Sequence, residues 1–353
     1  GVQTCALPIY LSLAENKLIP NVVIVSNKKF DQFTDKYSNK VMTINDIALP
    51  IKDSFLKNQS DLVLKQGNYL AMPYSSMPYV FFYRKDILSK VGIDPSTIKT
   101  WDDFINTGNV LQQKTKGKVK MLSANVQNGD MFKMLLNQLG GSYFDNDGKV
   151  TAGDSKFQKA VVTLKKLNDS GIVFEGNGNT TQSLVDGTTV FAPAGIDFSS
   201  FLSSQDPNQK GNFGIVKFPA FENGGGNSVA YDGSSIVEIN TGTNKALTED
   251  FIKFAATDKE TLLDSFTKYS FFSAYLPLYN LKYFNDNVEY FNGESIWNKF
   301  IESGKDSSEF IYSKNFEAAD ISVIKAQGKI LKGENIISTL KEMQNSIKIE
   351  PQK

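Results

Sequence analysis

The amino-acid sequence predicts an α/β protein built from two domains or lobes. Its 353 residues are too many for one compact core, since single cores rarely grow beyond about 250–300 residues. Short β-branched runs alternate with amphipathic helical segments along the chain, and this alternation is typical of α/β architecture. No internal repeat of fixed period is present in the sequence.

The first half of the chain contains three candidate strands. The β-branched run at residues 22–25 predicts a fully buried strand. Residues 69–73 and 79–83 predict two more strands. Because Ser75 and Ser76 stand between them, we expect these two strands to meet at a polar loop.

Helix-capping residues mark the next elements. Thr100 predicts a helix start, because its hydroxyl can accept a hydrogen bond from the backbone N–H of Asp103. Residues 119–122 predict a strand. Residues 131–139 predict a short helix, which Gly140 would end.

The second half begins with the strongest turn signal in the chain. Asp147-Gly148 predicts a hairpin over residues 143–151. Asp154 then predicts the start of a helix that ends at Gly171. The apolar face of that helix consists of Phe157, Val161, Leu164 and Leu167. Two further strands and a mostly helical C-terminal third complete the prediction, with the strands at residues 189–192 and 235–239.

The acidic run at residues 145–148 also suggests a calcium loop. An EF-hand loop needs acids at its positions 1, 3 and 5, then glycine, and glutamate at position 12. Tyr143 stands at the first of these positions and Asp154 at the last. A hairpin turn therefore explains the run better than a calcium site does.

Composition excludes several classes of function. Lysine and arginine total 38, as do aspartate and glutamate, so the formal net charge is zero. Nucleic-acid binding and polybasic membrane binding both need a surplus of basic charge, so no nucleic-acid partner is expected. No apolar run approaches the roughly 20 residues of a membrane-spanning helix.

The chain lacks the residues of many catalytic and metal sites. Histidine is absent, and Cys5 is the only cysteine. Catalytic triads with histidine, histidine-containing zinc sites, disulfides and thiolate clusters are therefore excluded. Acid–base chemistry would rest on Asp, Glu, Lys or Tyr, so a binding protein without cofactor or metal is favoured over an enzyme.

One segment carries a family resemblance. Residues 69–104 read YLAMPYSSMPYVFFYRKDILSKVGIDPSTIKTWDDF, in which YRKD, GIDP and TWDDF follow one another in order. This resembles the signature of the extracellular solute-binding proteins of ABC transporters, in the maltose-binding-protein-like group that binds sugars and oligosaccharides. Further similar segments follow in the family's order, at residues 140–143, 186–191, 195–198, 215–219, 231–235, 255–257 and 275–278.

The resemblance covers residues 18–347, with two departures. Family members usually open with a strand and a helix before the segment that is represented here by residues 20–23, so we expect an N-terminally truncated chain. Tyr143 and Phe198 stand where the family often has tryptophan.

The resemblance implies a two-lobed, periplasmic-binding-protein-like type II fold with a ligand cleft between the lobes. Hinge closure around the ligand is the motion expected of such a fold. We expect residues 10–118 and 227–282 in the first lobe, 119–226 and 283–347 in the second, and an irregular terminus at 1–9.

Sugar binding implies two kinds of side chain. Hydroxyl groups need polar partners, and the apolar faces of sugar rings favour aromatic platforms. We expect such residues on loops at strand ends, with aspartates as hydroxyl acceptors. The candidates are Asn27, Tyr74, Ser75, Ser76, Asn125, Gln127, Tyr143, Asp197, Phe198, Tyr231, Asp232 and Tyr275.

The function implied is that of a substrate-binding receptor of an ABC importer, without catalysis. Its partners would be a sugar or oligosaccharide, the ABC permease and its ATPase, and the receptor would be a monomer. It would act at the extracellular face of the cytoplasmic membrane, lipid-anchored in the full-length bacterial protein, or in the periplasm.

Two alternatives stay open. The same fold could bind a peptide, an amino acid or a polyamine, although arginine for a carboxylate clamp is scarce and Arg84 stands in a strand-end motif. A carboxylate-based glycosidase would need two acids about 5 to 10 Å apart across a cleft.

Overall fold

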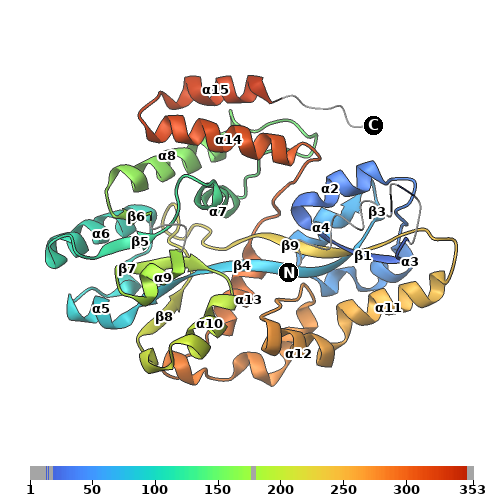
Figure 1. Cartoon of the computed structure of the whole chain (residues 1–353), viewed down its shortest axis with the longest axis horizontal. Coiled ribbons are helices and arrows are strands. Elements are labelled where there is room, and N and C mark those ends of the chain that lie inside the picture. The colour runs from blue at the N-terminus through green and yellow to red at the C-terminus, as the bar shows by residue number, and fades with distance from the viewer. Residues whose placement is uncertain (1–12, 14, 16–18, 176–179, 348–353) are drawn as a thin grey trace.

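The chain folds into two groups of elements that share two long strands, β4 (Met72–Arg84) and β9 (Val229–Glu238) (Figure 1). The computed structural model describes Leu13, Glu15 and residues 19–175 and 180–347. Cys5 and the terminus predicted to be irregular, at residues 1–9, lie outside the described residues.

The strands form one main sheet and one short hairpin. The main sheet has seven strands in the order β1-β9-β4-β7-β5-β6, and β8 also pairs with β4. Its remaining strands are β1 (Val22–Ser26), β5 (Lys120–Ser123), β6 (Val173–Phe174), β7 (Thr189–Ala194) and β8 (Phe213–Val216). The hairpin consists of β2 (Leu64–Lys65) and β3 (Asn68–Tyr69).

Strand β4 belongs to both groups. Its first part, from Met72 to Tyr79, pairs with β9, and its second part, from Val80 to Arg84, pairs with β7 and β8. The predicted loop between two strands is therefore wrong, since one strand runs through. Two register shifts, after Pro73 and before Pro78, let the strand keep pairing although proline offers no N–H.

Strand β1 confirms the prediction at residues 22–25 in position but not in burial. It pairs antiparallel with β9 at the end of the sheet. Val23 and Val25 are buried, whereas Ile24 is 55% exposed. Side chains of a strand alternate between its two faces, so only one face of β1 is covered.

Helices surround each end of the sheet (Figure 1). Around β1 and its neighbours, and below β4 in the view of Figure 1, lie α2 (Asn27–Lys36), α3 (Asn45–Ala48), α4 (Lys57–Val63), α11 (Lys245–Thr257), α12 (Lys259–Tyr269) and α13 (Trp297–Asp306). Toward β5–β8 lie α5 (Lys85–Lys90), α6 (Trp101–Thr115), α7 (Asp130–Gln138), α8 (Ser155–Asp169), α9 (Thr180–Val185), α10 (Asp197–Gln205), α14 (Phe316–Leu331) and α15 (Ile336–Ser346). Short 3₁₀ helices are η2 (Leu49–Ser54), η3 (Pro95–Thr97), η4 (Pro207–Gln209), η5 (Leu276–Asn280), η6 (Lys282–Asn285) and η7 (Glu289–Phe291).

The predicted Thr100 cap and the predicted hairpin are confirmed, whereas Asp154 stands at the N-cap of α8 without a side-chain hydrogen bond to the helix. The Asp103 N–H donates to Thr100 Oγ1 at 3.1 Å, and the Thr100 N–H donates back to Asp103 Oδ2 at 2.9 Å. This reciprocal capping box starts α6. Phe144 and Val150 pair across the predicted hairpin. All four apolar residues on the predicted face of α8 are buried.

The core lies on both sides of β4. Phe81 and Phe82 are adjacent and fully buried, and they point to opposite faces of the sheet. Phe81 packs against Trp101, Phe104, Phe191 and Phe218, and Phe82 packs against Phe198, Phe291 and Phe300. Each buried phenylalanine contributes about 1.5–3 kcal/mol to folding, so this strand stabilises two hydrophobic clusters at once.

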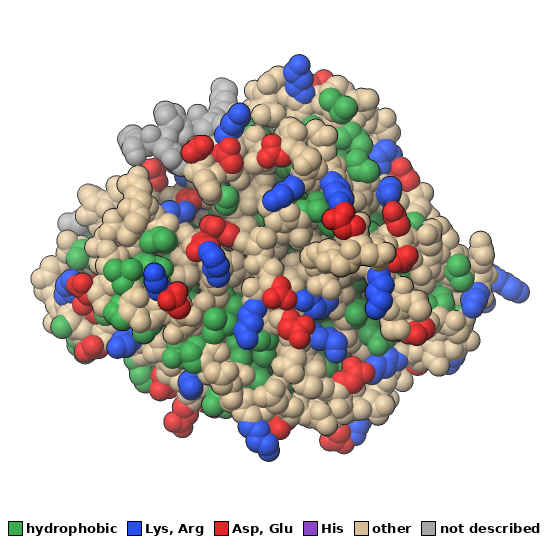
Figure 2. Space-filling model, turned by 180° about the vertical axis from the view of Figure 1, so that it is seen from behind, with side chains coloured by type: hydrophobic (Ala, Val, Ile, Leu, Met, Phe, Trp, Pro, Cys, Tyr) green, Lys and Arg blue, Asp and Glu red, His purple; other side chains and the backbone are tan. Residues whose placement is uncertain are grey.

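The surface carries charges of both signs. Figure 2 shows lysine interspersed with aspartate and glutamate on the face it presents, without a large area of one sign. Of the helices that the structure describes, none has the length and apolar character needed to span a membrane.

Candidate functional site

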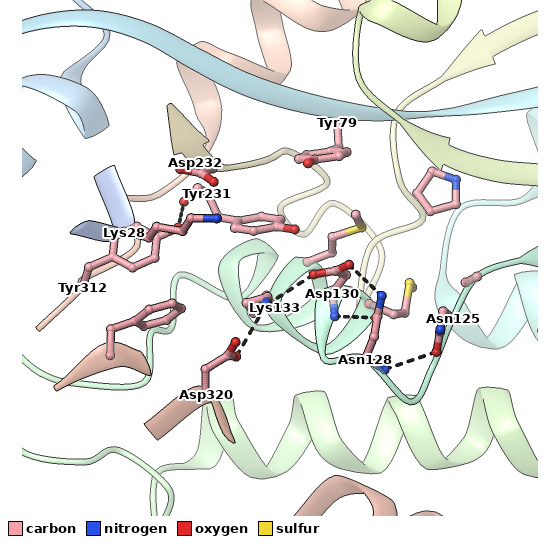
Figure 3. Close-up of a pocket in the computed structure, with 15 residues that line it drawn as sticks. Lys28, Tyr79, Asn125, Asn128, Asp130, Lys133, Tyr231, Asp232, Tyr312 and Asp320 are labelled. Carbon is pink, nitrogen blue, oxygen red and sulfur yellow. Dashed lines mark hydrogen bonds and ion pairs between the residues drawn. The ribbon is translucent and has the colours of Figure 1, made fainter. Parts of the chain in front are cut away.

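A cavity of about 420 Å³ opens between the two groups of elements (Figure 3). Its size is within the range of about 300–1,000 Å³ typical of small-molecule sites. One wall comes from α2, β4 and β9, and the other comes from α7, α14 and the loop after β5. The lining residues are Lys28, Tyr79, Ala124, Asn125, Asn128, Asp130, Met131, Lys133, Met134, Pro193, Tyr231, Asp232, Tyr312, Phe316 and Asp320.

Two stacked tyrosines form an aromatic wall. The rings of Tyr79 on β4 and Tyr231 on β9 lie 5.4 Å apart and are inclined by only 9°. Tyr79 pairs with Val229, two residues before Tyr231, so the two rings are diagonal neighbours on one face of the sheet. The Tyr312 hydroxyl donates a hydrogen bond to the Tyr231 carbonyl oxygen and so holds the backbone at Tyr231 in place.

Both stacked tyrosines keep their protons at neutral pH. Burial is the main cause that raises the pKa of Tyr79 above its ordinary value of 10.0, and the negative charge of Asp232 adds to the effect. Burial likewise raises the pKa of Tyr231 well above 10.0. The wall is therefore neutral and apolar, as a platform for an uncharged ring should be.

Asp232 follows the aromatic wall on β9. Its Oδ1 accepts the Gly233 N–H at 2.8 Å, and no hydrogen bond to its Oδ2 is found among the described residues. Burial raises the pKa of this carboxyl above its ordinary 3.8, although the Gly233 N–H, Lys28 and Lys133 act in the opposite direction. Asp232 thus presents an acceptor oxygen to the cavity.

The backbone beside Asp232 requires glycine. A Cβ atom at Gly233 would lie 2.2 Å from the Ser75 carbonyl oxygen of β4. No side chain can occupy that space without moving the backbone of one strand. The close approach of the two strands at Gly233 therefore fixes where Asp232 enters the cavity.

A network of charged residues forms the opposite wall. Lys133 Nζ on α7 lies 3.3 Å from Asp130 Oδ1 and 3.4 Å from Asp320 Oδ1 on α14. The Tyr143 hydroxyl donates to the same Asp320 oxygen at 2.9 Å. Asn128 Nδ2 donates to Asp130 Oδ2 at 2.8 Å. Figure 3 shows Asp320 reaching from α14 toward Lys133.

Asn125 lines the cavity from the loop after β5. Its Oδ1 accepts the backbone N–H groups of Gln127, at 2.8 Å, and of Asn128, at 3.2 Å. These two bonds hold the loop as an Asx turn. No hydrogen bond from Asn125 Nδ2 is found within the described part of the chain, so this amide is available as a donor.

Of the twelve residues predicted for the site, the structure places three in the cavity wall, namely Asn125, Tyr231 and Asp232. Four more lie just outside that wall. Asn27 is buried and donates to Gln59 Oε1. Ser75 Oγ lies 2.7 Å from Ser234 Oγ. The two remaining neighbours of the wall are buried Ser76 and buried Tyr143.

The other five predicted residues do not line the cavity. Tyr74 and Tyr275 pack against Phe271 and Phe55. Phe198 is buried against Phe82, and Asp197 begins α10. Gln127 Nε2 reaches Glu175 Oε1 at 3.4 Å on the surface. A role in ligand contact stays a prediction for all twelve residues.

Sequence reasoning missed most of the second wall. Asp130 and Lys133 are three residues apart on α7, and Phe316 and Asp320 are four apart on α14. Such spacing puts each pair on one helix face. Polar residues on a helix usually face solvent. The only signal in the sequence is therefore on α14, where an acid follows a large aromatic residue by one helical turn.

The acidic run at residues 145–148 forms a turn. Asp145 Oδ1 accepts the backbone N–H groups of Asp147 at 3.0 Å and Lys149 at 2.8 Å. In the region that the structure describes, no group of three or more Cys, Asp or Glu side chains is arranged to hold a metal ion.

Solved sugar-binding proteins have a similar fold. The sugar-binding protein MalE from Xanthomonas citri matches with a TM-score of 0.83 at 15% identity, over 98% of this chain and 87% of that one. The cyclic α-maltosyl-1,6-maltose-binding protein from Arthrobacter globiformis matches with a TM-score of 0.78 at 16% identity, over 97% and 86%. These likenesses show the fold alone, and they confirm the predicted two-lobed α/β fold with a cleft between its lobes.

Sequence relatives include two arabinooligosaccharide-binding proteins. The protein from Halalkalibacterium halodurans is 26% identical over 70% of this chain and 56% of its own length. The protein from Bacillus subtilis is 24% identical over 71% and 59%. A lactose-binding protein from Rhizobium radiobacter is 21% identical over 80% and 68%. The chain thus spans less than three fifths of the length of the first two relatives.

A family model matches across most of the chain. The model describes bacterial extracellular solute-binding proteins, and it matches residues 13–262. That range includes the capping-box helix α6, the loop with Asn125 and the strand with Tyr231 and Asp232. Because the match covers well over half of the sequence, the chain belongs to the bacterial extracellular solute-binding protein family, a family of binding proteins.

Proposed function

We propose that this protein is the substrate-binding receptor of an ABC importer and captures a neutral sugar or oligosaccharide in the cavity. The observation that carries the proposal is the stacked pair Tyr79 and Tyr231 beside the free carboxylate oxygen of Asp232. An apolar ring face can pack on the tyrosines while a hydroxyl of the same sugar donates to the carboxylate. The names of the sequence relatives, which bind arabinooligosaccharides and lactose, support this ligand class.

The charges of the cavity favour a neutral ligand over an anionic one. The wall holds three carboxylates, from Asp130, Asp232 and Asp320, and two ammonium groups, from Lys28 and Lys133. The balance, two minus three, is one negative charge, which repels a ligand carboxylate.

The chain also offers no arginine for a carboxylate clamp. Arg84 is the only arginine in the sequence. It is buried and is bound to both carboxylate oxygens of Asp86 at 2.8 Å. A free amino acid or a peptide is usually held by such a clamp, so neither is favoured here.

The remaining parts of the proposal follow the family. The receptor acts as a monomer outside the cytoplasmic membrane, either lipid-anchored or periplasmic, and hands its ligand to a permease that is driven by an ATPase. It catalyses no reaction. The lobes stay as predicted from the sequence, residues 10–118 with 227–282 and 119–226 with 283–347, although α5 and α6 lie beside β8 and β5, and α13 lies beside β4 and β9. Since β4 pairs with strands at both ends of the sheet, the hinge motion would also bend this strand.

The test is calorimetric titration of the protein with lactose, maltose and an arabinotriose. Spermidine, a dipeptide and a free amino acid serve as non-sugar solutes. We expect one sugar class to bind and to remain chemically intact after prolonged incubation. If spermidine binds and no sugar does, the ligand is a cation and not a sugar, since carboxylates and aromatic rings also attract cations. Cleavage of a sugar would favour the glycosidase alternative.

A variant of Asp232 tests whether the sugar binds in the cavity. We expect Asp232→Ala to weaken sugar affinity several-fold or more while far-ultraviolet circular dichroism stays unchanged. Thr115→Ala, which changes the last turn of α6, is the control and should bind like the wild type. Equal affinities of Asp232→Ala and the wild type would contradict the assignment of the cavity.

A further inference from the structure

The carboxylate of Asp320 is held by only one of its oxygens. Tyr143 and Lys133 both contact Oδ1, at 2.9 and 3.4 Å. No hydrogen bond to Oδ2 is found among the residues that the structure describes. The Asp320 side chain is 23% exposed and lines the cavity, so its second oxygen faces space that a ligand can fill.

Tyr143 is a fixed hydrogen-bond donor. Its ring is fully buried, and it lies 5.4 Å from the ring of Phe316 at an angle of 20°. Three more rings surround it, those of Phe132, Phe157 and Phe310. Burial first, and then the charge of Asp320, raises the pKa of Tyr143 well above 10.0. The hydroxyl therefore stays protonated, and its donor direction is set by the packed ring.

Asp232 on the other wall is held in a corresponding way. Its Oδ1 is bound by the Gly233 N–H at 2.8 Å, and its Oδ2 has no hydrogen bond within the described chain. Asp232 comes from β9 and Asp320 comes from α14, so the two free oxygens belong to opposite walls of the cavity.

Resting on the sugar-binding function proposed above, we propose that Asp320 is a second hydroxyl acceptor of the cavity and that Tyr143 is its positioning residue. The Tyr143 hydroxyl donates a hydrogen bond to Asp320 Oδ1, and this bond orients Oδ2 toward the ligand. A carboxylate can only accept hydrogen bonds, so the ligand must present a hydroxyl to each wall.

Selectivity follows from this arrangement. A sugar that donates to Asp232 and Asp320 at once bridges the two walls and favours the closed protein. A sugar with one of these hydroxyls methylated leaves a carboxylate desolvated and unpaired, and a site of this kind rejects such an analogue strongly. The cavity is thus specific for ligands with hydroxyl donors on two sides.

The experiment is a double-mutant cycle on affinity, measured by calorimetry with whichever of lactose, maltose and arabinotriose binds the wild type. We expect Asp320→Asn to lose about 10- to 100-fold in affinity, as for a hydrogen bond to a charged group. Tyr143→Phe removes only the hydroxyl and should lose about three- to tenfold. In the Asp320→Asn background, Tyr143→Phe should cause no further loss, because the residue acts through Asp320.

Tyr279→Phe is the matched control. Tyr279 is also buried, and its hydroxyl donates to the Ser273 carbonyl at 2.5 Å, away from the cavity. This variant should bind the sugar like the wild type. The unfolding midpoint of each ligand-free variant shows whether it is folded. If Tyr143→Phe loses affinity at an unchanged midpoint, the loss comes from the position of the Asp320 carboxylate and not from lower stability.

Three results would overturn the inference. Unchanged affinity in Asp320→Asn removes this residue from the site. Losses that multiply in the double variant show that Tyr143 does not act through Asp320. If the wild type binds sugar and either of these results is found, the proposed function stands and only the inference is overturned. A wild type that binds none of the three sugars overturns both.

Discussion

Asp232 combines an unfavourable burial with a position in the cavity wall. Its carboxyl has a raised pKa, chiefly because burial disfavours its charged form. At neutral pH the ionised carboxyl therefore lowers the free energy of unfolding. This destabilisation disappears as the pH falls through the raised pKa. The protein therefore retains at this position a charge that folding alone would not favour.

Asp232→Asn should have opposite effects on stability and on binding. At pH 7 we expect a higher free energy of unfolding than in the wild type, because the desolvated charge is removed. The gain should shrink as the pH is lowered toward the ordinary aspartate value of 3.8, where the wild-type carboxyl is protonated. Denaturant titrations at pH 7 and pH 4 measure this difference.

The second part of the prediction for Asp232→Asn concerns its affinity for sugar. It should fall about tenfold in Asp232→Asn, because the charged acceptor of the hydrogen bond is replaced by a neutral amide oxygen. Lower stability at pH 7 together with unchanged affinity would contradict both parts.

Ser76 offers a contrast with Asp232. It was predicted to contact ligand, yet it is 2% exposed, and its Oγ has no hydrogen-bond partner among the described residues. Removing a buried hydroxyl without a partner should leave stability unchanged or raise it slightly.

Ser76→Ala should therefore keep both sugar affinity and unfolding midpoint. Ser75→Ala is the comparison, because Ser75 Oγ lies 2.7 Å from Ser234 Oγ, and losing that contact should lower the midpoint. Thermal unfolding with and without sugar measures both variants. A loss of affinity in Ser76→Ala would return this residue to the site.

The sequence located one cavity residue that follows a strand and two that lie within a family segment. Asn125 follows β5, and Tyr231 and Asp232 lie in a family segment on β9, so position alone brought them to the cavity wall. Asp320 was missed because a single acid in a helix has no local signature. Tyr143 was predicted as a platform, but its ring is covered by the aromatic cluster that only tertiary packing assembles.

At the scale of elements, the capping box of α6 was fully predictable. The spacing of Thr100 and Asp103 specifies both hydrogen bonds without any tertiary contact. Strand β4 was not predictable as one element, because Pro73, Ser75, Ser76 and Pro78 together are typical of a loop. The pairing of this segment with β9 outweighs that local preference.

Thr100→Ala should destabilise the protein by about 1 kcal/mol through loss of the N-cap. Thr115→Ala, in the last turn of the same helix, removes only a bond to the Leu111 carbonyl and should cost less. Neither residue lines the cavity, so sugar affinity should stay at the wild-type value for both. Urea titration and calorimetry test the pair, and equal losses of stability would contradict the importance of the cap.

At the scale of the whole molecule, the ligand should bring the lobes together. A sugar that contacts both walls lowers the free energy of the closed form, so the radius of gyration from X-ray scattering should decrease on saturation. A solute that calorimetry shows not to bind is the control. An unchanged radius with a saturating sugar would contradict hinge closure.

The same ligand should raise the unfolding midpoint. At about 100 times the dissociation constant, a ligand of the folded state adds about 2.7 kcal/mol of stability. Because β4 and β9 bind the two lobes into one sheet, we expect one cooperative transition with and without sugar. Separate melting of the two lobes would contradict that expectation.

The path of β4 also affects how the protein is made. This strand is complete at Arg84, but β9 begins only at Val229, so about 145 further residues (229 − 84) must be synthesised before the two can pair. At about 5–20 residues per second, that delay is on the order of ten seconds. During most of this time Phe82 has left the ribosome before its partners Phe198, Phe291 and Phe300 are made. The growing chain should therefore depend on chaperones until translation is well past its midpoint.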